Sequence, residues 1–287
     1  MTTQNRREFL TLLGAAAVAA ASGCTVAAAP RRKLNRIGLQ LYTVRDQMQA
    51  DLPGTLARVA AAGYKEVEFA GYFGRTPAQI RDLLARNSLT SPSTHVPIQM
   101  MRTDWQKTLD FAREVGHQWV VIPWLPDEER GNLDSWKKIA AELNTGGRAA
   151  RAAGLHVGYH NHDFELKPTT ASAGAPSAIP LEVLITETDP ALVDFELDLY
   201  WLTKGGADAV DYFNRFGKRF PLVHVKDSRG APEHVMTEVG SGSIDFRRIF
   251  AQSDKAGIRH YFVEHDNPAN PLESIRTSYN QLSALQY

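Results

Sequence analysis

Short apolar runs alternate with longer amphipathic segments along most of this chain. Eight of the runs have the length and composition of buried strands, and we expect strands at 37–42, 66–70, 91–96, 119–124, 156–162, 194–198, 222–227 and 261–266. A segment with helical character follows each of them, at 51–62, 76–86, 104–115, 133–153, 178–186, 208–216, 246–256 and 272–285. Eight such repeats without an internal gap predict an α/β fold with a single (β/α)8 TIM barrel over residues 36–287.

An open, doubly wound sheet is the alternative fold. It is disfavoured because no glycine-rich fingerprint for a dinucleotide follows any of the expected strands. The stretch 167–180 is rich in Pro, Ala, Ser, Thr and Gly, which predicts a loop after the fifth strand. That loop would lie over the carboxyl ends of the strands as a lid or a variable insertion, and we favour the insertion.

The last four expected strands begin apolar and end in side chains that commonly bind metals. His160, Asp198, His224 and Glu264 lie near the carboxyl ends of the fifth to eighth strands. Parallel strands bring these ends to one face of an α/β fold, so we expect the four side chains to converge. Two imidazoles and two carboxylates suit a divalent ion, and manganese, cobalt, iron and zinc all fit.

Each of these residues also has a structural interpretation. A histidine at a strand end is often a hydrogen-bonded structural group, Asp198 could cap the following turn, and Glu264 could pair with an arginine. The metal hypothesis is stronger for the set than for any member, because burying several charges together without an ion is costly.

Other polar and aromatic residues near the strand ends are candidates for contacting a substrate. His95 could bind a substrate hydroxyl or be a packed core histidine. Lys226 could stabilise an oxyanion or act as acid or base, or it could pair with Asp227 or Glu264. Further candidates for substrate contact are Tyr42, Asn161, Trp201 and Arg229. Core packing is the alternative for the aromatic residues, although aromatic side chains often form the walls of sugar sites.

The overall charge is balanced, with 32 basic and 32 acidic side chains among 287 residues. This balance gives no electrostatic reason to expect nucleic acid or an anionic membrane surface as partner. The apolar content of 43% and charged content of 22% are ordinary for a globular protein. The composition therefore indicates an ordinary globular protein and does not by itself suggest a partner.

The N-terminal residues carry signals of export rather than of the barrel. Arg6 and Arg7 belong to a motif that resembles a twin-arginine signal, and an apolar, alanine-rich stretch follows. Cys24, the one cysteine of the chain, ends a sequence that resembles a lipobox. We expect residues 1–24 to be a signal peptide including the lipobox cysteine and 25–35 to be a linker. The lipidated Cys24 would then hold the protein to a bacterial membrane on its periplasmic side.

Several blocks together resemble the sugar phosphate isomerase/epimerase family of xylose isomerase-like barrels. The blocks are Gly38-Leu-Gln-Leu-Tyr-Thr-Val-Arg45, Tyr159-His-Asn-His-Asp-Phe-Glu165, Phe195-Glu-Leu-Asp-Leu-Tyr-Trp201, His224-Val-Lys-Asp227 and Val239-Gly-Ser-Gly-Ser-Ile-Asp-Phe246. The resemblance covers nearly all of the chain after the signal peptide. It implies a divalent ion, most often manganese, held by Glu, Asp, His and Glu from strands five to eight. By position Asp198, His224 and Glu264 match the last three of these ligands.

Two residues depart from the family pattern. His160 stands in place of the first glutamate, and Trp201 stands where sugar epimerases commonly have a histidine that contacts the substrate. Losing one glutamate disfavours two-base epimerisation, but it leaves a chemistry that needs one base and a metal-stabilised enediolate. The resemblance thus favours a lyase or isomerase that acts on a keto-sugar or 3-keto-glycoside. Glu264 or His162 would take the proton, and Lys226 or His95 would assist the leaving oxygen.

Two other functions stay open at this point. One is aldose–ketose isomerisation or epimerisation, and the other is a lipid-anchored, non-catalytic carbohydrate-binding barrel. A DNA-repair endonuclease of the same superfamily is disfavoured by the export signals and the neutral charge.

Overall fold

The computed structural model describes residues 32–172 and 174–287, and Lys33–Tyr287 form one compact unit. The expected signal peptide, its Cys24 and residues 25–31 of the expected linker lie outside the described residues. Among the described helices, none combines the length and the apolar character that crossing a membrane requires.

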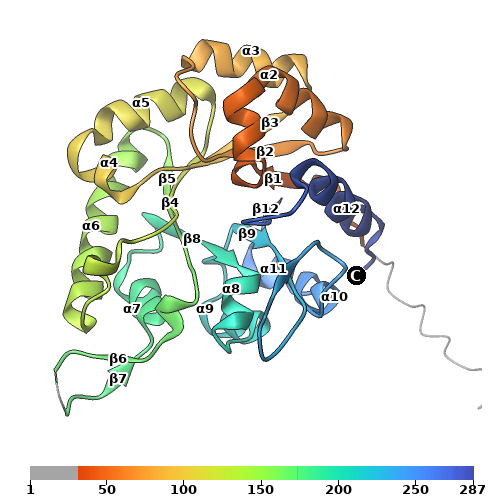
Figure 1. The fold of residues 1–287 in the computed structure, drawn as a ribbon. Helices are drawn as coiled ribbons and strands as arrows, with labels where there is room; N and C mark the ends of the chain where they lie inside the picture. Colours follow the sequence, from red (N-terminus) through yellow and green to blue (C-terminus); the bar gives the residue numbers. More distant parts are fainter. Residues whose placement is uncertain (1–31, 173) are drawn as a thin grey trace, which may run out of the picture. The chain divides into compact units, whose positions relative to one another are not determined.

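Eight parallel strands close into a barrel, which confirms the predicted fold (Figure 1). In spatial order they are β1 (Gly38–Gln40), β12 (His260–Val263), β9 (Leu222–Val225), β8 (Val193–Asp198), β5 (His156–His160), β4 (Trp119–Ile122), β3 (Thr90–His95) and β2 (Glu66–Phe69). The barrel closes where Gly38 of β1 pairs with Phe262 of β12. The continuous apolar runs become strands because each is covered by helices outside and by other strands inside.

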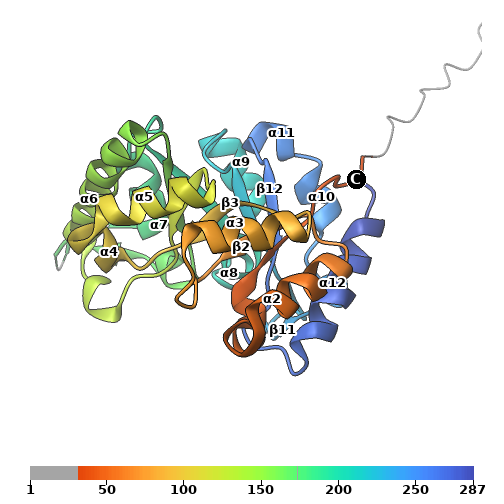
Figure 2. The same ribbon diagram turned by 90° about the horizontal axis from the view of Figure 1, so that it is seen from above.

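Helices surround the barrel, as the view from above shows (Figure 2). The expected ones are α2 (Arg45–Ala61), α3 (Pro77–Arg86), α5 (Trp105–Val115), α6 (Leu133–Ala152), α7 (Pro180–Glu187), α9 (Ala209–Phe216), α10 (Phe246–Phe250), α11 (Ser253–Ala256) and α12 (Pro271–Ala284). Their starts follow local capping signals. At α3, for example, the Thr76 side chain accepts a hydrogen bond from the backbone of Gln79, and the Gln79 side chain accepts one from the backbone of Thr76.

The structure differs from the sequence prediction in several helices. Helix α2 begins at Arg45 rather than at 51, because two helical stretches join across a non-helical Asp51 whose side chain accepts a hydrogen bond from the backbone of Gly54. The expected helix 246–256 is divided into α10 and α11. Short helices also follow β3 and β8, namely α4 (Ile98–Thr103) and α8 (Leu199–Lys204). Both are too short for a helical period to be recognised in the sequence.

Two small hairpins and three short 3₁₀ helices complete the described elements. The expected loop 167–180 contains the hairpin of β6 (Thr169–Thr170) and β7 (Ser177–Ala178). A second hairpin joins β10 (Asp227–Ser228) to β11 (Met236–Thr237). The 3₁₀ helices are η1 (Leu41–Val44), η2 (Asp127–Glu129) and η3 (Phe164–Leu166).

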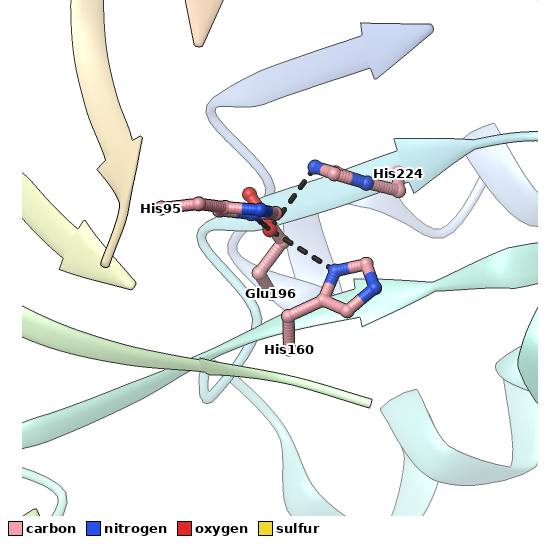
Figure 3. A group of neighbouring side chains, drawn as sticks. All are labelled: His95, His160, Glu196 and His224. Carbon is pink, nitrogen blue, oxygen red and sulfur yellow. Dashed lines mark hydrogen bonds and ion pairs between the residues drawn. The ribbon is translucent and has the colours of Figure 1, made fainter. Parts of the chain in front are cut away.

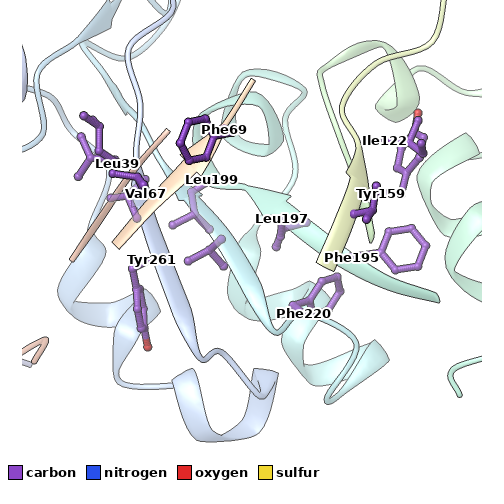
Figure 4. Packing of buried hydrophobic residues seen from close by; sticks show 14 of the residues in the cluster. Leu39, Val67, Phe69, Ile122, Tyr159, Phe195, Leu197, Leu199, Phe220 and Tyr261 are labelled. Atoms are coloured by element: carbon purple, nitrogen blue, oxygen red, sulfur yellow. The ribbon is translucent and has the colours of Figure 1, made fainter. Parts of the chain in front are cut away.

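The main hydrophobic core lies between the barrel and its helices (Figure 4). Among its buried members are Leu39, Val67, Phe69, Ile122, Tyr159, Phe195, Leu197, Leu199, Phe220 and Tyr261. A smaller apolar layer fills the inside of the barrel, formed by Trp119, Val121, Leu222 and Phe262. Gly158 faces this layer, where a Cβ atom would lie 2.8 Å from Val121 Cγ2. This apolar layer separates the polar groups at the carboxyl ends of the strands from the opposite end of the barrel.

Candidate metal centre and active site

The polar side chains at the carboxyl ends of the strands include two pairs of carboxylates with two histidines between them. We call Glu68 of β2 and Glu196 of β8 the inner carboxylates. Asp198 at the end of β8 and Glu264 just after β12 are the outer carboxylates. All four are buried. His160 and His224 lie between the two pairs and are almost fully buried as well.

Glu196, one of the inner carboxylates, contacts one ring nitrogen of each of three histidines (Figure 3). Glu196 Oε2 lies 2.7 Å from His95 Nε2, 3.1 Å from His160 Nδ1 and 3.0 Å from His224 Nε2. Glu68 Oε2 lies 2.7 Å from His224 Nε2 and accepts a hydrogen bond from Gln40 Nε2 at 2.7 Å. Because a ring N–H bonded to a carboxylate fixes the orientation of the imidazole, this arrangement aims the second nitrogen of each ring outward.

The second nitrogens of His160 and His224 face the outer carboxylates. His160 Nε2 lies 3.7 Å from Asp198 Oδ2, and His224 Nδ1 lies 2.8 Å from Glu264 Oε2 and 4.0 Å from Asp198 Oδ2. The structure therefore brings the four sequence-predicted ligands together. Donor atoms of Asp198, His224 and Glu264 lie close enough to hold one ion, while His160 belongs by the same criterion to an overlapping group with His95, Glu196 and His224.

Lys226 fills the space between the outer carboxylates. Its Nζ lies 3.1 Å from Asp198 Oδ2, 2.6 Å from Glu264 Oε2 and 2.8 Å from Asp266 Oδ1. Burial opposes the charge on Lys226, but Asp198 and Glu264 outweigh it and hold its pKa well above the usual range. The pair with Glu264 that the sequence left as an alternative is present, whereas the three carboxylates contacting Nζ do not include Asp227.

Burial and neighbouring charges set different protonation states at the other groups. Burial resists ionisation of Glu264, yet the charges on Lys226 and His224 hold its pKa well below the usual range. Burial likewise raises the pKa of Asp198 to about 6. His95 is partly buried, and Glu68 and Glu196 raise its pKa to about 9. At neutral pH, His95 therefore carries a proton that it can donate.

His162 lies at the opening of the site between two aromatic rings. Its ring centroid is 5.6 Å from that of Phe164 and 5.1 Å from that of Trp201. Its Nδ1 is buried without a hydrogen-bond partner, and burial lowers its pKa to about 3. Glu165 fixes this segment, because it accepts hydrogen bonds from the backbone of His162 and from the Tyr159 hydroxyl. His162 is therefore a neutral, well-positioned imidazole with a free nitrogen.

A cavity of about 560 Å³ opens over these groups. It is lined by Tyr42, Ala70, His95, Pro97, Pro123, Trp124, His160, His162, Lys226, Glu264, Asp266 and Asn267. Tyr42 and Trp124 are 44% and 46% exposed, so their rings are free to form walls of a binding site. The volume lies within the range of small-molecule sites.

Three of the expected substrate contacts lie outside this lining. Asn161 is buried, and its Oδ1 accepts a hydrogen bond from the backbone N–H of Asp198, so it positions a ligand candidate. Trp201 packs against His162. Arg229 is exposed in the β10–β11 segment.

Sequence reasoning missed Glu68 and assigned no role to Glu196 or Asp266. A signal was present, since alternation along β2 turns Glu66 and Glu68 to one side and Val67 and Phe69 to the other. Acidic residues at alternate positions of a strand that is otherwise apolar indicate a polar barrel interior. Their partners on other strands could not be identified from the sequence.

Residues 56–282 match the model of the xylose isomerase-like TIM barrels. The chain belongs to this family. Among curated relatives, an inosose dehydratase of Lacticaseibacillus casei is 25% identical over 263 residues, which cover 78% of this chain and 86% of that protein. A sugar phosphate isomerase/epimerase of Parabacteroides distasonis, known from its crystal structure, is 27% identical with a TM-score of 0.76, covering 92% of this chain and 98% of that one.

These xylose isomerase-like relatives are enzymes that modify carbohydrates, as the resemblance implied. A crystal structure of the IolI protein with a bound zinc atom has a TM-score of 0.68 to this chain at 15% identity, covering 86% of this chain and 96% of that one. That likeness concerns the fold. The family and the general type of enzyme are thus established, while the metal and the substrate of this chain are matters for proposal.

Proposed function

We propose that this protein is a metal-dependent lyase that eliminates a group from a keto-sugar or keto-glycoside. The observation that carries the proposal is the orientation of His160 and His224, each with one nitrogen toward an inner carboxylate and the other toward an outer one. A carboxylate that holds the far nitrogen of a ligating histidine is a recurring feature of metal sites. The carbohydrate relatives supply the substrate class.

The residues present fit a divalent ion. The buried Asp198 Oδ2 accepts no hydrogen bond, although Lys226 lies 3.1 Å away. His160 Nε2, Asp198 Oδ2, His224 Nδ1 and Glu264 Oε2 would hold the ion, which we propose to be manganese, with cobalt, iron or zinc as alternatives. When bound, such an ion would polarise the substrate carbonyl and favour an enediolate. Lys226 would then shift toward Asp266, with which it already forms an ion pair.

The elimination needs a base, an acid and no redox partner. We propose that the neutral imidazole of His162, which lines the cavity, takes the proton from the carbon beside the carbonyl, because Glu264 Oε2 already contacts His224 and Lys226. The electron pair of that C–H bond forms the new double bond and expels the oxygen on the next carbon. His95, which lines the cavity and is protonated at neutral pH, donates a proton to the leaving oxygen.

Deuterium exchange tests this function. Purified protein loaded with Mn²⁺ would be mixed with 3-keto-glucosides in heavy water, with bound metal measured by mass spectrometry and the sugar followed by NMR. We expect about one ion per chain, loss of the proton beside the carbonyl, and an unsaturated product. The His162→Gln variant should lose exchange but keep the ion, whereas the control His156→Gln, altered at the start of β5 outside the cavity lining, should keep both. A protein that binds no metal and exchanges no proton would instead be a sugar-binding barrel.

We further propose that the protein works on the periplasmic side of a bacterial membrane, attached through a lipidated Cys24. The twin-arginine motif, the apolar stretch and the lipobox-like sequence support this. At that location we expect the substrate to carry no phosphate group. Mass spectrometry of the mature N-terminus would reveal a diacylated cysteine, and the Cys24→Ala variant should lack it.

A further inference from the structure

A second cavity, almost entirely apolar, adjoins the catalytic one. Its volume is about 260 Å³, and we call it the annex. It is lined by Ala70, Gly71, Tyr72, Thr94, His95, Val96, Pro97, Met100, Lys107, Thr108, Phe111 and Ala112. Ala70, His95 and Pro97 line the catalytic cavity as well, so the two spaces meet at these residues.

The wall of the annex is mostly apolar and includes the aromatic residues Tyr72 and Phe111. The rings of Tyr72 and Phe111 are 4.4 Å apart between centroids, and Phe69 packs behind Tyr72 at 5.3 Å. The hydroxyl of Tyr72 is engaged by His117, whose Nε2 lies 2.8 Å away. That histidine is anchored in turn by its Nδ1, 2.7 Å from the carbonyl oxygen of Ser91. The aromatic wall is thus held in place by a hydrogen-bonded chain of buried groups.

The size and polarity of the annex exclude most parts of a sugar. An apolar protein cavity of about 150 Å³ is known to accept benzene, so about 260 Å³ has room for a substituted ring. Hydroxyl or phosphate groups placed against these carbon atoms would lose their hydrogen bonds to water without replacement. The polar residue Lys107 is exposed at the rim, where a larger ligand could reach solvent.

We propose that the annex binds an aromatic leaving group, so that the substrate is a keto-glycoside of a ring-bearing alcohol or phenol. The inference rests on the proposed lyase function and specifies its substrate class. His95 lines both cavities, which places it between a sugar ring over the metal centre and an aromatic group in the annex. The oxygen that joins the two parts would lie there, next to the His95 side chain.

The products follow from the bond that breaks. Proton abstraction at carbon two, beside a keto group at carbon three, forms a double bond between carbons one and two. The bond from carbon one to the glycosidic oxygen breaks, and that oxygen leaves with a proton as the free alcohol or phenol. No electrons are gained or lost overall, so no oxidant or reductant is needed in this step.

The test compares the benzyl and methyl glycosides of 3-keto-glucose. Benzyl alcohol and methanol have similar acidity, so a preference for the benzyl substrate reports binding and not leaving-group chemistry. We expect kcat/KM to be about tenfold or more higher for the benzyl glycoside, the range that apolar contacts of this size provide. Equal values for the two substrates would overturn the proposal.

Substitutions in helix α5 test whether the preference for the benzyl glycoside arises in the annex. Thr108 lines the annex and is half-buried, so Thr108→Phe should fill the space and lower the ratio of kcat/KM for the benzyl to that for the methyl glycoside to about one. Gln106 lies exposed on the same helix, and Gln106→Phe adds the same ring without entering the annex. A preference that persists in a folded Thr108→Phe variant would refute the assignment. Thermal unfolding of both variants shows whether each is folded.

Binding without turnover separates this inference from the proposed function. Unoxidised benzyl glucoside lacks the keto group, and saturation-transfer NMR should show its aromatic protons in contact with wild-type protein but not with Thr108→Phe. If that contact occurs while no keto-sugar exchanges a proton, the lyase function is wrong and the annex stands. If proton exchange occurs and the aromatic protons show no contact, the annex assignment is wrong and the lyase stands.

Discussion

Replacing Glu196 by glutamine should weaken metal binding at a site of which Glu196 is not a proposed ligand. Its Oε2 lies within 3.1 Å of nitrogens on His95, His160 and His224. Glutamine keeps the shape of the side chain but removes its charge and places an amide group among these ring N–H groups. His160 would then lose the carboxylate that orients it toward the ion, and His224 would be held by Glu68 alone.

The size of the effect follows from the support that Glu196 gives to the two histidines. Removing the partner of a ligating histidine typically lowers metal affinity by about 10- to 100-fold, or about 1.4–2.7 kcal/mol. At a free Mn²⁺ concentration 100 times the wild-type dissociation constant, binding stabilises the wild-type fold by about 2.7 kcal/mol. The same concentration would stabilise Glu196→Gln by only about 0.4–1.4 kcal/mol. For a domain of this length each kcal/mol corresponds to about 2–4 °C in Tm.

Thermal unfolding with and without Mn²⁺ provides the assay, and competition with a fluorescent chelator gives the affinity directly. The metal-dependent rise in Tm should fall to about half or less in Glu196→Gln. Glu165→Gln is a matched control, because Glu165 is also buried and hydrogen-bonded but contacts Tyr159 and His162 rather than the proposed ligands. A folded Glu196→Gln variant with wild-type affinity for Mn²⁺ would refute the reasoning.

Three further changes test other parts of the structure. Lys226→Met removes a cation that lies between two proposed ligands and would compete with the ion for them. Mn²⁺ should therefore bind about tenfold more tightly in a titration, while the metal-free variant should lose about 3–5 kcal/mol of unfolding free energy in urea. Weaker Mn²⁺ binding would contradict this competition between Lys226 and the ion. Asn161→Ala leaves the buried N–H of Asp198 without its acceptor, which should cost about 1–3 kcal/mol of stability, measured the same way, and an unchanged midpoint would argue against that role. Burial lowers the pKa of His117 to about 4 from its ordinary 6.5, so its neutral form contributes stability above pH 6.5 that is lost as the pH falls toward 4. That loss is about 3 kcal/mol, and His117→Gln should show a correspondingly flatter dependence of unfolding free energy between pH 7 and pH 4.5.

The sequence was sufficient for the barrel because the strands and helices repeat eight times with clear periodicity. Apolar runs such as 119–122 are recognisable without knowing their neighbours, since a strand covered on both faces has no polar side. The short α4 and α8 helices were missed because six residues do not display a helical period. The helical stretch before Asp51 was missed because Asp51, whose side chain caps the second stretch, looked like the start of the whole helix.

The sequence predicted only those residues of the candidate site that come together because of their position at the end of a strand. His160, Asp198, His224 and Glu264 come together because each lies at or near the carboxyl end of its strand. The inner carboxylates were harder to recognise, since their importance depends on register between strands far apart in sequence. Glu68 meets His224, for example, across 156 positions of the chain. Such pairings arise from barrel closure, which no local pattern encodes.

Under the proposed metal function, the inner carboxylates would compensate for the histidine at position 160, where the family resemblance implies a glutamate. An imidazole at position 160 takes one negative charge out of the ligand set, but Glu196 lies directly behind it and bonds its far nitrogen. The negative charge that the histidine removes from the ligand set is therefore still present nearby, on Glu196 directly behind it. Five carboxylates, those of Glu68, Glu196, Asp198, Glu264 and Asp266, face three basic groups, those of Lys226, His95 and His224. That formal excess of two negative charges in a buried site favours a divalent cation, and it argues that His160 alters the chemistry of the centre without abolishing its capacity for metal.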